Sequence, residues 1–115
     1  MTAEMILDYI GIILDKEAIA KEDFTINVNL TDTNEKIMLR FNNGALLQYY
    51  NTSSDSADLT ITCPKNALAF ILQKDMGKIR AVMKLDGDVS KLELIVDNLN
   101  QFNISANADY NIVEP

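Results

Sequence analysis

The residues of this chain that could do chemistry are few, and histidine is absent from its 115 residues. With no imidazole and a single cysteine, Cys63, the chain has no His or Cys cluster for zinc and no Ser-His-Asp or Cys-His nucleophile system. Cys63 could be a thiol activated by the start of the following helix, or a small buried residue at the end of a strand. We favour the buried residue, and a single cysteine allows no intrachain disulfide.

Asp86 and Asp88 flank Gly87 and could form a carboxylate pair for acid–base chemistry or for calcium. The segment lacks the number of oxygen ligands that a calcium loop supplies. A glycine between two aspartates is typical of a turn, and we interpret Asp88 as the cap of the helix that follows. We therefore expect no catalytic residue, no metal and no cofactor.

The charge balance argues against nucleic acid as a partner. The net charge is −7, and the Lys and Arg residues are scattered rather than gathered in a stripe that could neutralise phosphates. Arg40, Arg80 and Lys84 could meet an anionic headgroup. Arg40, however, lies on the polar phase of a predicted strand, which favours a solvated face.

No segment of the sequence is suited to a membrane. No apolar run approaches the roughly 18 residues that a spanning helix requires. The N-terminal segment carries Glu4 and Asp8 and has no basic stretch, unlike a secretory signal. We therefore expect no membrane span and a cytoplasmic location.

Alternation of apolar and polar residues predicts strands with one buried face. Four such segments lie within residues 23–32, 36–41, 45–50 and 57–63, and a fifth strand is predicted at 82–86. We expect the first four strands to form an antiparallel meander. The run NNG, at residues 42–44, can adopt the positive φ that a tight hairpin needs.

Helical periodicity predicts helices at residues 2–14, 64–75 and 89–102, with a turn and a short helix or loop after Met76. Thr2 suits the N-cap of the first helix, and Pro64 suits the first turn of the second. This order of elements predicts one α+β domain, residues 1–115, with helices packed on one face of a five-stranded, mostly antiparallel sheet.

Five short motifs carry a family resemblance. They are AEMILDYI at 3–10, LTDTNEKI at 30–37, FNNGAL at 41–46, LDGD at 85–88 and YNIVEP at 110–115. Each motif alone is weak, because such turn chemistry is common, but their order and spacing are specific. On these motifs the chain resembles the C-terminal domain of the alkyl sulfatases, which is similar to the sterol carrier protein fold. Ala3 departs from the usual proline, and the stretch between Phe102 and Tyr110 is longer than in the family.

The resemblance implies a bacterial-type accessory domain rather than an enzyme. Alkyl sulfatases carry their zinc site in an upstream metallo-β-lactamase-like domain, and a chain without histidine cannot hold that site. We expect no sulfatase activity from these residues, whether they are a C-terminal fragment of a larger enzyme or a free-standing copy of the module.

The resemblance also implies that a long-chain alkyl or lipid ligand lies in a hydrophobic tunnel between the sheet and its helices. Burial of such a chain contributes about 0.8 kcal/mol per CH₂ group. We expect seven apolar residues to line the tunnel, although each could also be ordinary core. They are Phe70, Leu72, Met76, Ile79, Met83, Phe102 and Ile104.

The alternative hypothesis is a structural or interaction domain whose groove is filled by its own side chains. Such a domain would pack on an upstream metallo-β-lactamase-like hydrolase domain or associate with itself as a homodimer. An exposed apolar patch would favour association.

Overall fold

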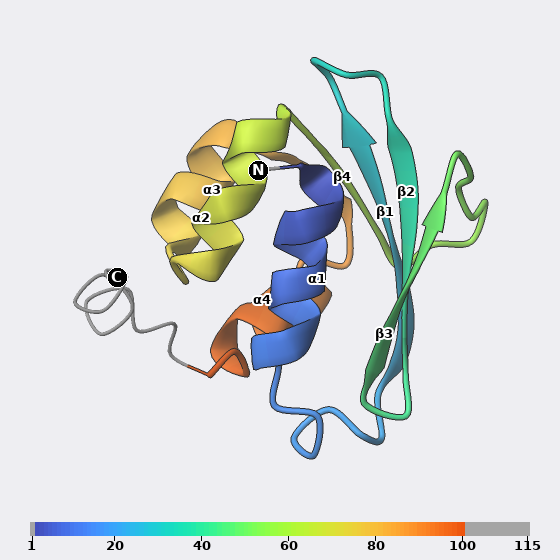
Figure 1. Cartoon of the computed structure of the whole chain (residues 1–115), viewed down its shortest axis with the longest axis vertical. Helices are drawn as coiled ribbons and strands as arrows, with labels where there is room; N and C mark the ends of the chain where they lie inside the picture. Colours follow the sequence, from blue (N-terminus) through green and yellow to red (C-terminus); the bar gives the residue numbers. More distant parts are fainter. Residues whose placement is uncertain (1, 101–115) are drawn as a thin grey trace, which may run out of the picture.

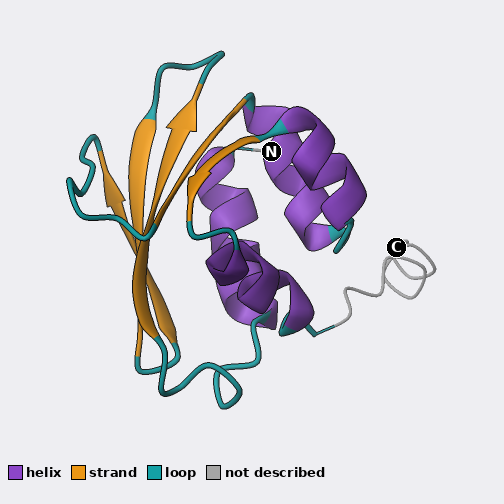
Figure 2. Cartoon of the chain, turned by 180° about the vertical axis from the view of Figure 1, so that it is seen from behind, coloured by secondary structure: helices purple, strands orange, loops and turns teal. Residues whose placement is uncertain are grey.

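The computed structural model describes residues 2–100, in which helices cover one face of a five-stranded sheet (Figure 1). The strands are β1 (Asp23–Leu30), β2 (Lys36–Asn42), β3 (Ala45–Tyr50), β4 (Leu59–Cys63) and β5 (Lys84–Gly87). The helices are α1 (Ala3–Ile13), the 3₁₀ helix η1 (Lys65–Leu68), α2 (Ala69–Leu72), α3 (Met76–Val82) and α4 (Ser90–Asp97). Figure 2 shows the same two layers from behind. The predicted α+β class and the single helical face are confirmed.

The strand order is β3-β2-β1-β4-β5, so the predicted meander of the first four strands is wrong. β1 pairs with β2, β2 with β3 and β4 with β5 in antiparallel fashion, whereas β4 lies parallel to β1. Alternation along a strand specifies which face is buried, but it does not specify which strand is the neighbour. The sheet is therefore mostly antiparallel, as predicted, with one parallel pair at its centre.

The connection from β3 to β4 crosses the polar face of the sheet. Asn27, buried on that face of β1, donates to the Ser54 carbonyl at 2.8 Å and accepts from the Ser54 N–H at 2.9 Å. Farther along, Asp58 accepts from the Thr25 N–H at 2.9 Å. These contacts hold the loop across β1 and deliver the chain to the far side of that strand.

The β2–β3 hairpin has the expected tight turn. Asn42 pairs with Ala45, and the two residues between them, Asn43 and Gly44, have φ values of 55° and 79°. Two positive φ values characterise the turn whose twist matches that of the flanking strands.

The helical segments differ from prediction between residues 64 and 82. The single helix predicted at 64–75 is η1 followed by the one-turn α2, because Lys74 adopts a left-handed conformation with φ of 56°. Asp75 then starts α3 by accepting from the Lys78 N–H at 3.0 Å. Val82 belongs to α3, and β5 begins at Lys84.

The helix predicted at 89–102 ends earlier, at Asp97, and Leu99 forms an isolated β-bridge with Leu14. Two predicted N-terminal caps agree with the structure. The Thr2 hydroxyl accepts from the Met5 N–H at 3.1 Å, as the predicted N-cap requires. The side chain of Asp88 accepts from the Ser90 N–H at 3.0 Å at the start of α4. Within residues 2–100, no helix has the length and apolar composition of a membrane span.

Candidate functional site

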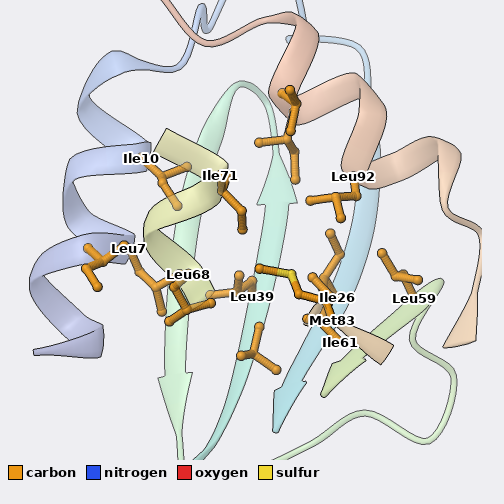
Figure 3. Packing of buried hydrophobic residues seen from close by; sticks show 14 of the residues in the cluster. Leu7, Ile10, Ile26, Leu39, Leu59, Ile61, Leu68, Ile71, Met83 and Leu92 are labelled. Carbon is orange, nitrogen blue, oxygen red and sulfur yellow. The ribbon is translucent and has the colours of Figure 1, made fainter. Parts of the chain in front are cut away.

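A small void lies between the sheet and the helices, and its described lining is entirely apolar. Its volume is about 20 Å³. The lining residues come from both layers: Leu7, Ile10, Ile26, Val28, Leu39, Phe41, Leu46, Ile61, Leu68, Ile71, Leu92 and Ile95. Figure 3 shows side chains of this cluster meeting from the helices and the strands.

The strand residues that line the void are those on the apolar face of the sheet, as the alternation of side chains along each strand requires. Register pairs Ile26 with Leu39 and Val28 with Ile61, so these side chains share one face. Their neighbours Thr25 and Asn27 point to the opposite face, as the period of two requires. The void is therefore at the centre of the apolar face of the sheet.

The helical side of the void comes from four separate elements. Leu7 and Ile10 lie on α1, and Leu92 and Ile95 lie on α4, each pair at helical spacing. Leu68 and Ile71 belong to η1 and α2, which have only four residues each. Helices this short have little stability of their own, so their position depends on tertiary packing.

The volume admits about one water-sized sphere and no hydrocarbon chain. Because the lining offers no polar partner, a water there would be unpaired and the void should be dry. Entry of a larger molecule therefore requires part of the lining to move.

The five described residues that we predicted for the tunnel lie in the helical layer or at its junction with β5. Ile79 and Met83 are buried in the core, and Figure 3 includes Met83 among the packed side chains. Phe70, Leu72 and Met76 are partly buried and pack against that core. None of the five is among the residues lining the void. Phe102 and Ile104 lie outside the described residues.

Sequence reasoning missed the residues that line the void because it treated them as ordinary strand and helix core. The available signal was the apolar phase of the strands, which identifies Ile26, Val28 and Leu39 as one face. The alternation pattern does not predict where a void remains between the sheet and the helices, because the position of a void depends on the packing of all the facing side chains together.

Two lysines of the helical layer make contacts that tie its short elements together. Lys74 Nζ donates to the Leu99 carbonyl at 2.9 Å, which links the end of α2 to the segment after α4. Lys78 Nζ lies 5.4 Å from the centre of the Phe70 ring, within the range of a cation–π contact. Both contacts are near the surface and hold the short helices in place.

Cys63 is buried, and burial raises the pKa of its thiol from 9.0 to about 11, with a further contribution from Asp32. A thiol with such a pKa stays protonated at neutral pH and is a poor nucleophile.

Asp88, Arg40 and Arg80, which the sequence singles out, each have a structural partner. The Ser90 hydroxyl and N–H hydrogen-bond to Asp88 and lower the pKa of its carboxyl. Arg40 pairs with Asp23 at 2.6 Å, and Arg80 pairs with Glu93 at 2.8 Å. Among residues 2–100, no group of three or more His, Cys, Asp and Glu residues could hold a metal ion.

Comparison with known proteins relates the whole chain to one family. The profile of the alkyl sulfatase C-terminal family matches residues 1–115. A linear primary-alkylsulfatase from Pseudomonas sp. is 25% identical over 119 aligned residues, covering 100% of this chain and 17% of that protein. This chain therefore spans only a small part of the curated relative that it matches.

Solved structures give the same relationship. The stereoselective inverting sec-alkylsulfatase Pisa1 from Pseudomonas sp. matches with a TM-score of 0.81 and 30% identity, covering 89% of this chain and 17% of that chain. A palmitated SCP2L2 from Aedes aegypti matches with a TM-score of 0.63 and 19% identity, covering 84% of this chain and 93% of that chain. At 19% identity the second match shows a shared fold.

Proposed function

This chain belongs to the alkyl sulfatase C-terminal family, and from that premise we propose that it is a non-catalytic module that binds the hydrocarbon tail of an amphiphile. The tail would lie between the sheet and the helices, in the space that begins as the apolar void. In a larger enzyme the same module would gather the alkyl tail of the substrate for an upstream hydrolase domain.

One observation carries this proposal: the void has an apolar lining and is bounded on one side by two four-residue helical segments, η1 and α2. An alkyl chain needs an apolar surface and no directional polar contact. Movement of η1 and α2 away from the sheet would expose the faces of Leu68 and Ile71 and lengthen the void. The palmitated relative supports a fold of this kind accepting a C16 acyl chain.

The hydrophobic gain from a long alkyl chain exceeds the hydrophobic cost of opening. Exposure of Leu68 and Ile71 would cost roughly 3–6 kcal/mol in total. A dodecyl chain with about eleven buried CH₂ groups would contribute roughly 9 kcal/mol. The cost is large enough to keep the free protein closed, and the gain is large enough to offset it when a long chain enters.

Native mass spectrometry tests the proposal directly. The protein is titrated with dodecyl sulfate and with palmitate, both below their micelle concentrations. We expect a saturable mass shift of one ligand per chain with either amphiphile and a weaker shift with an octyl chain, since fewer CH₂ groups are buried. Graded multiple adducts, or no adduct, would overturn the proposal and leave a structural domain with a closed core.

A second measurement locates the ligand. In NMR spectra, palmitate binding should shift the methyl signals of Leu68, Ile71 and Leu92 and leave those of Leu47, on the opposite face of the sheet, unchanged. Shifts confined to surface methyl groups would place the ligand outside the layers and contradict the proposed site.

A further inference from the structure

The two edges of the sheet differ in how they are protected. β5 has four residues and carries Lys84, Asp86 and Gly87, which are typical of an edge that resists pairing with another chain. β3, at the other edge, has the six residues ALLQYY, with no charge, no proline and no glycine. The outward backbone N–H and C=O groups of β3 therefore lie on an apolar strand that lacks the usual protection against pairing with another chain.

Exposed apolar side chains are concentrated on β3 and on α1, the helix that borders it. Among the described residues, six large hydrophobic side chains are exposed, and five of these belong to β3 or to α1. They are Met5, Ile12, Leu47, Tyr49 and Tyr50. Ile12, which is 72% exposed, borders a groove of about 340 Å³ between α1 and β3.

We propose that β3 is a homodimer interface, in which a second copy of this chain adds its own β3 antiparallel to the first, with a twofold axis at Gln48. The sheet would then continue through both copies as ten strands. This inference concerns a different surface from the ligand-binding proposal and does not depend on it.

The hydrogen-bond phase of β3 fits this axis. The Asn51 N–H donates to the Lys36 carbonyl at 2.8 Å, and the register places Tyr50 opposite Ile37. In an antiparallel ladder the direction of the backbone groups alternates, so odd-numbered residues of β3 face β2. Leu46, Gln48 and Tyr50 therefore direct their backbone N–H and C=O groups outward. A twofold axis at Gln48 pairs these three residues with Tyr50, Gln48 and Leu46 of the second copy.

The side chains fit the same register. Residues directly opposite each other in an antiparallel pair lie on the same face of the sheet. On the outer face, Leu47 of each copy would meet Tyr49 of the other, and these side chains are 46% and 44% exposed. An aromatic side chain opposite an aliphatic one is a favourable cross-strand pair.

Each copy would supply both members of the Leu47–Tyr49 pairs, and this favours a second copy of the chain over an unrelated strand. On the helical face, Gln48 donates to Asp8 at 2.6 Å and accepts from the Tyr50 hydroxyl, so its side chain is already held beside the axis. A one-residue shift would place outer-face residues opposite helix-face residues, so a twofold axis must pass through a residue rather than between two residues. Gln48 is the residue that brings Leu47 and Tyr49 together.

Sedimentation velocity over a range of protein concentrations provides the first test. We expect the unmodified chain to form dimers, and Leu47→Lys to weaken dimerisation by at least about tenfold, since it adds like charges to a flat apolar edge. Val82→Lys is the matched control, because Val82 is 44% exposed on α3 and lies on the side of the sheet opposite to β3, so the dimerisation of this variant should be unchanged. Because each copy carries a net charge of −7, dimerisation should also strengthen as salt is added.

Cross-linking tests the register even if Leu47→Lys fails to fold. Leu47→Cys and Tyr49→Cys chains are prepared separately and oxidised alone or as a mixture. In the proposed register residue 47 lies opposite residue 49, at the roughly 4.5 Å Cα separation of a non-hydrogen-bonded pair, which a disulfide can bridge. The mixture should therefore cross-link at least about tenfold more than either chain alone.

Three outcomes would overturn the proposal. The first is a chain that stays monomeric at every concentration and salt level. The second is a dimer that Val82→Lys weakens as much as Leu47→Lys does, which would place the interface elsewhere. The third is efficient cross-linking of Leu47→Cys alone, which would indicate another register. Capture of an alkyl ligand in any of these cases would leave the ligand-binding proposal standing.

Discussion

Asn27 and Ser54 are joined by two hydrogen bonds, one in each direction between an amide side chain and a peptide unit. The Asn27 amide nitrogen donates to the Ser54 carbonyl at 2.8 Å, and its oxygen accepts from the Ser54 N–H at 2.9 Å. Asn27 is 6% exposed, so these groups would otherwise lack full access to water. This pair holds the loop that carries the chain across the sheet to β4, which lies parallel to β1.

Asn27→Ala should destabilise the fold by about 1–3 kcal/mol, since it leaves the Ser54 peptide groups without their partners. Asn27→Asp should cost at least as much, because a carboxylate cannot donate to the Ser54 carbonyl and places a charge beside it. Urea unfolding of the two variants provides the comparison. Thr60→Ala, on the same face in β4 but only partly buried, is a control expected to change stability less. Equal effects of Asn27→Ala and Thr60→Ala would show that the Ser54 contacts contribute little.

Gly44→Ala should destabilise the β2–β3 hairpin by about 1–3 kcal/mol. Gly44 has φ of 79°, and an added Cβ would lie 2.8 Å from the Lys16 carbonyl oxygen, so the substitution combines strain with a collision against backbone. Thermal unfolding measures the effect.

Gly77→Ala is the matched control for Gly44→Ala, and its effect should have the opposite sign. Gly77 lies in the first turn of α3, where an added Cβ would lie at an ordinary 3.4 Å from Asp75 Oδ1. Alanine is the better helix former by roughly 0.5–1 kcal/mol. A loss of stability in both variants would refute the explanation based on local conformation.

Filling the void should weaken binding of an alkyl chain. Val28→Ile adds one methyl group beside a void of about 20 Å³, and Val82→Ile adds the same group on the exposed side of α3. We expect the palmitate dissociation constant to rise several-fold for Val28→Ile, with little or no loss of stability, and to stay unchanged for Val82→Ile. Competition with a fluorescent fatty acid measures both constants. An unchanged constant for Val28→Ile would show that the ligand does not use this space.

Enlarging the void should have the reverse effect on binding and a measurable cost in stability. Leu68→Ala removes part of the lining contributed by η1, and core substitutions of this kind cost about 2–5 kcal/mol. The added space lowers the work of admitting a chain, so palmitate should bind more tightly to the folded variant. Binding is compared at a temperature where circular dichroism shows both proteins folded. Weaker binding would indicate that Leu68 contacts the ligand rather than blocks its path.

Cys63 should make stability fall at alkaline pH. Burial raises the pKa of its thiol from 9.0 to about 11, so the unfolded chain releases the proton before the folded chain does. The contribution is fully present below pH 9 and is lost as the pH rises from 9 toward 11. Urea unfolding at several pH values should therefore show a shallower alkaline decline for Cys63→Ala than for the unmodified protein. Parallel declines in the two proteins would contradict the shifted pKa.

The positions of the strands and the buried faces of β1, β2 and β4 could be predicted from the sequence, because both depend on local chemistry. Alternation identified Phe24, Ile26 and Val28 as one face, and all three are buried. The Asn-Gly pair of the hairpin and the Thr2 cap act through their immediate neighbours, and both were predicted. The split of the helix predicted at 64–75 was missed, because lysine, unlike glycine, rarely adopts the left-handed conformation that Lys74 has.

An apolar sheet face, the helices that cover it, the lack of histidine chemistry and the resemblance to the family can all be read from residue types and local spacing. The position of β4 beside β1 cannot, because it depends on contacts between distant segments, such as the one between Asn27 and Ser54. The same is true of the space of about 20 Å³ between the layers and of the place of β3 at an uncharged edge. Strand order and residual volume arise from contacts between elements far apart in the chain, which no local pattern encodes.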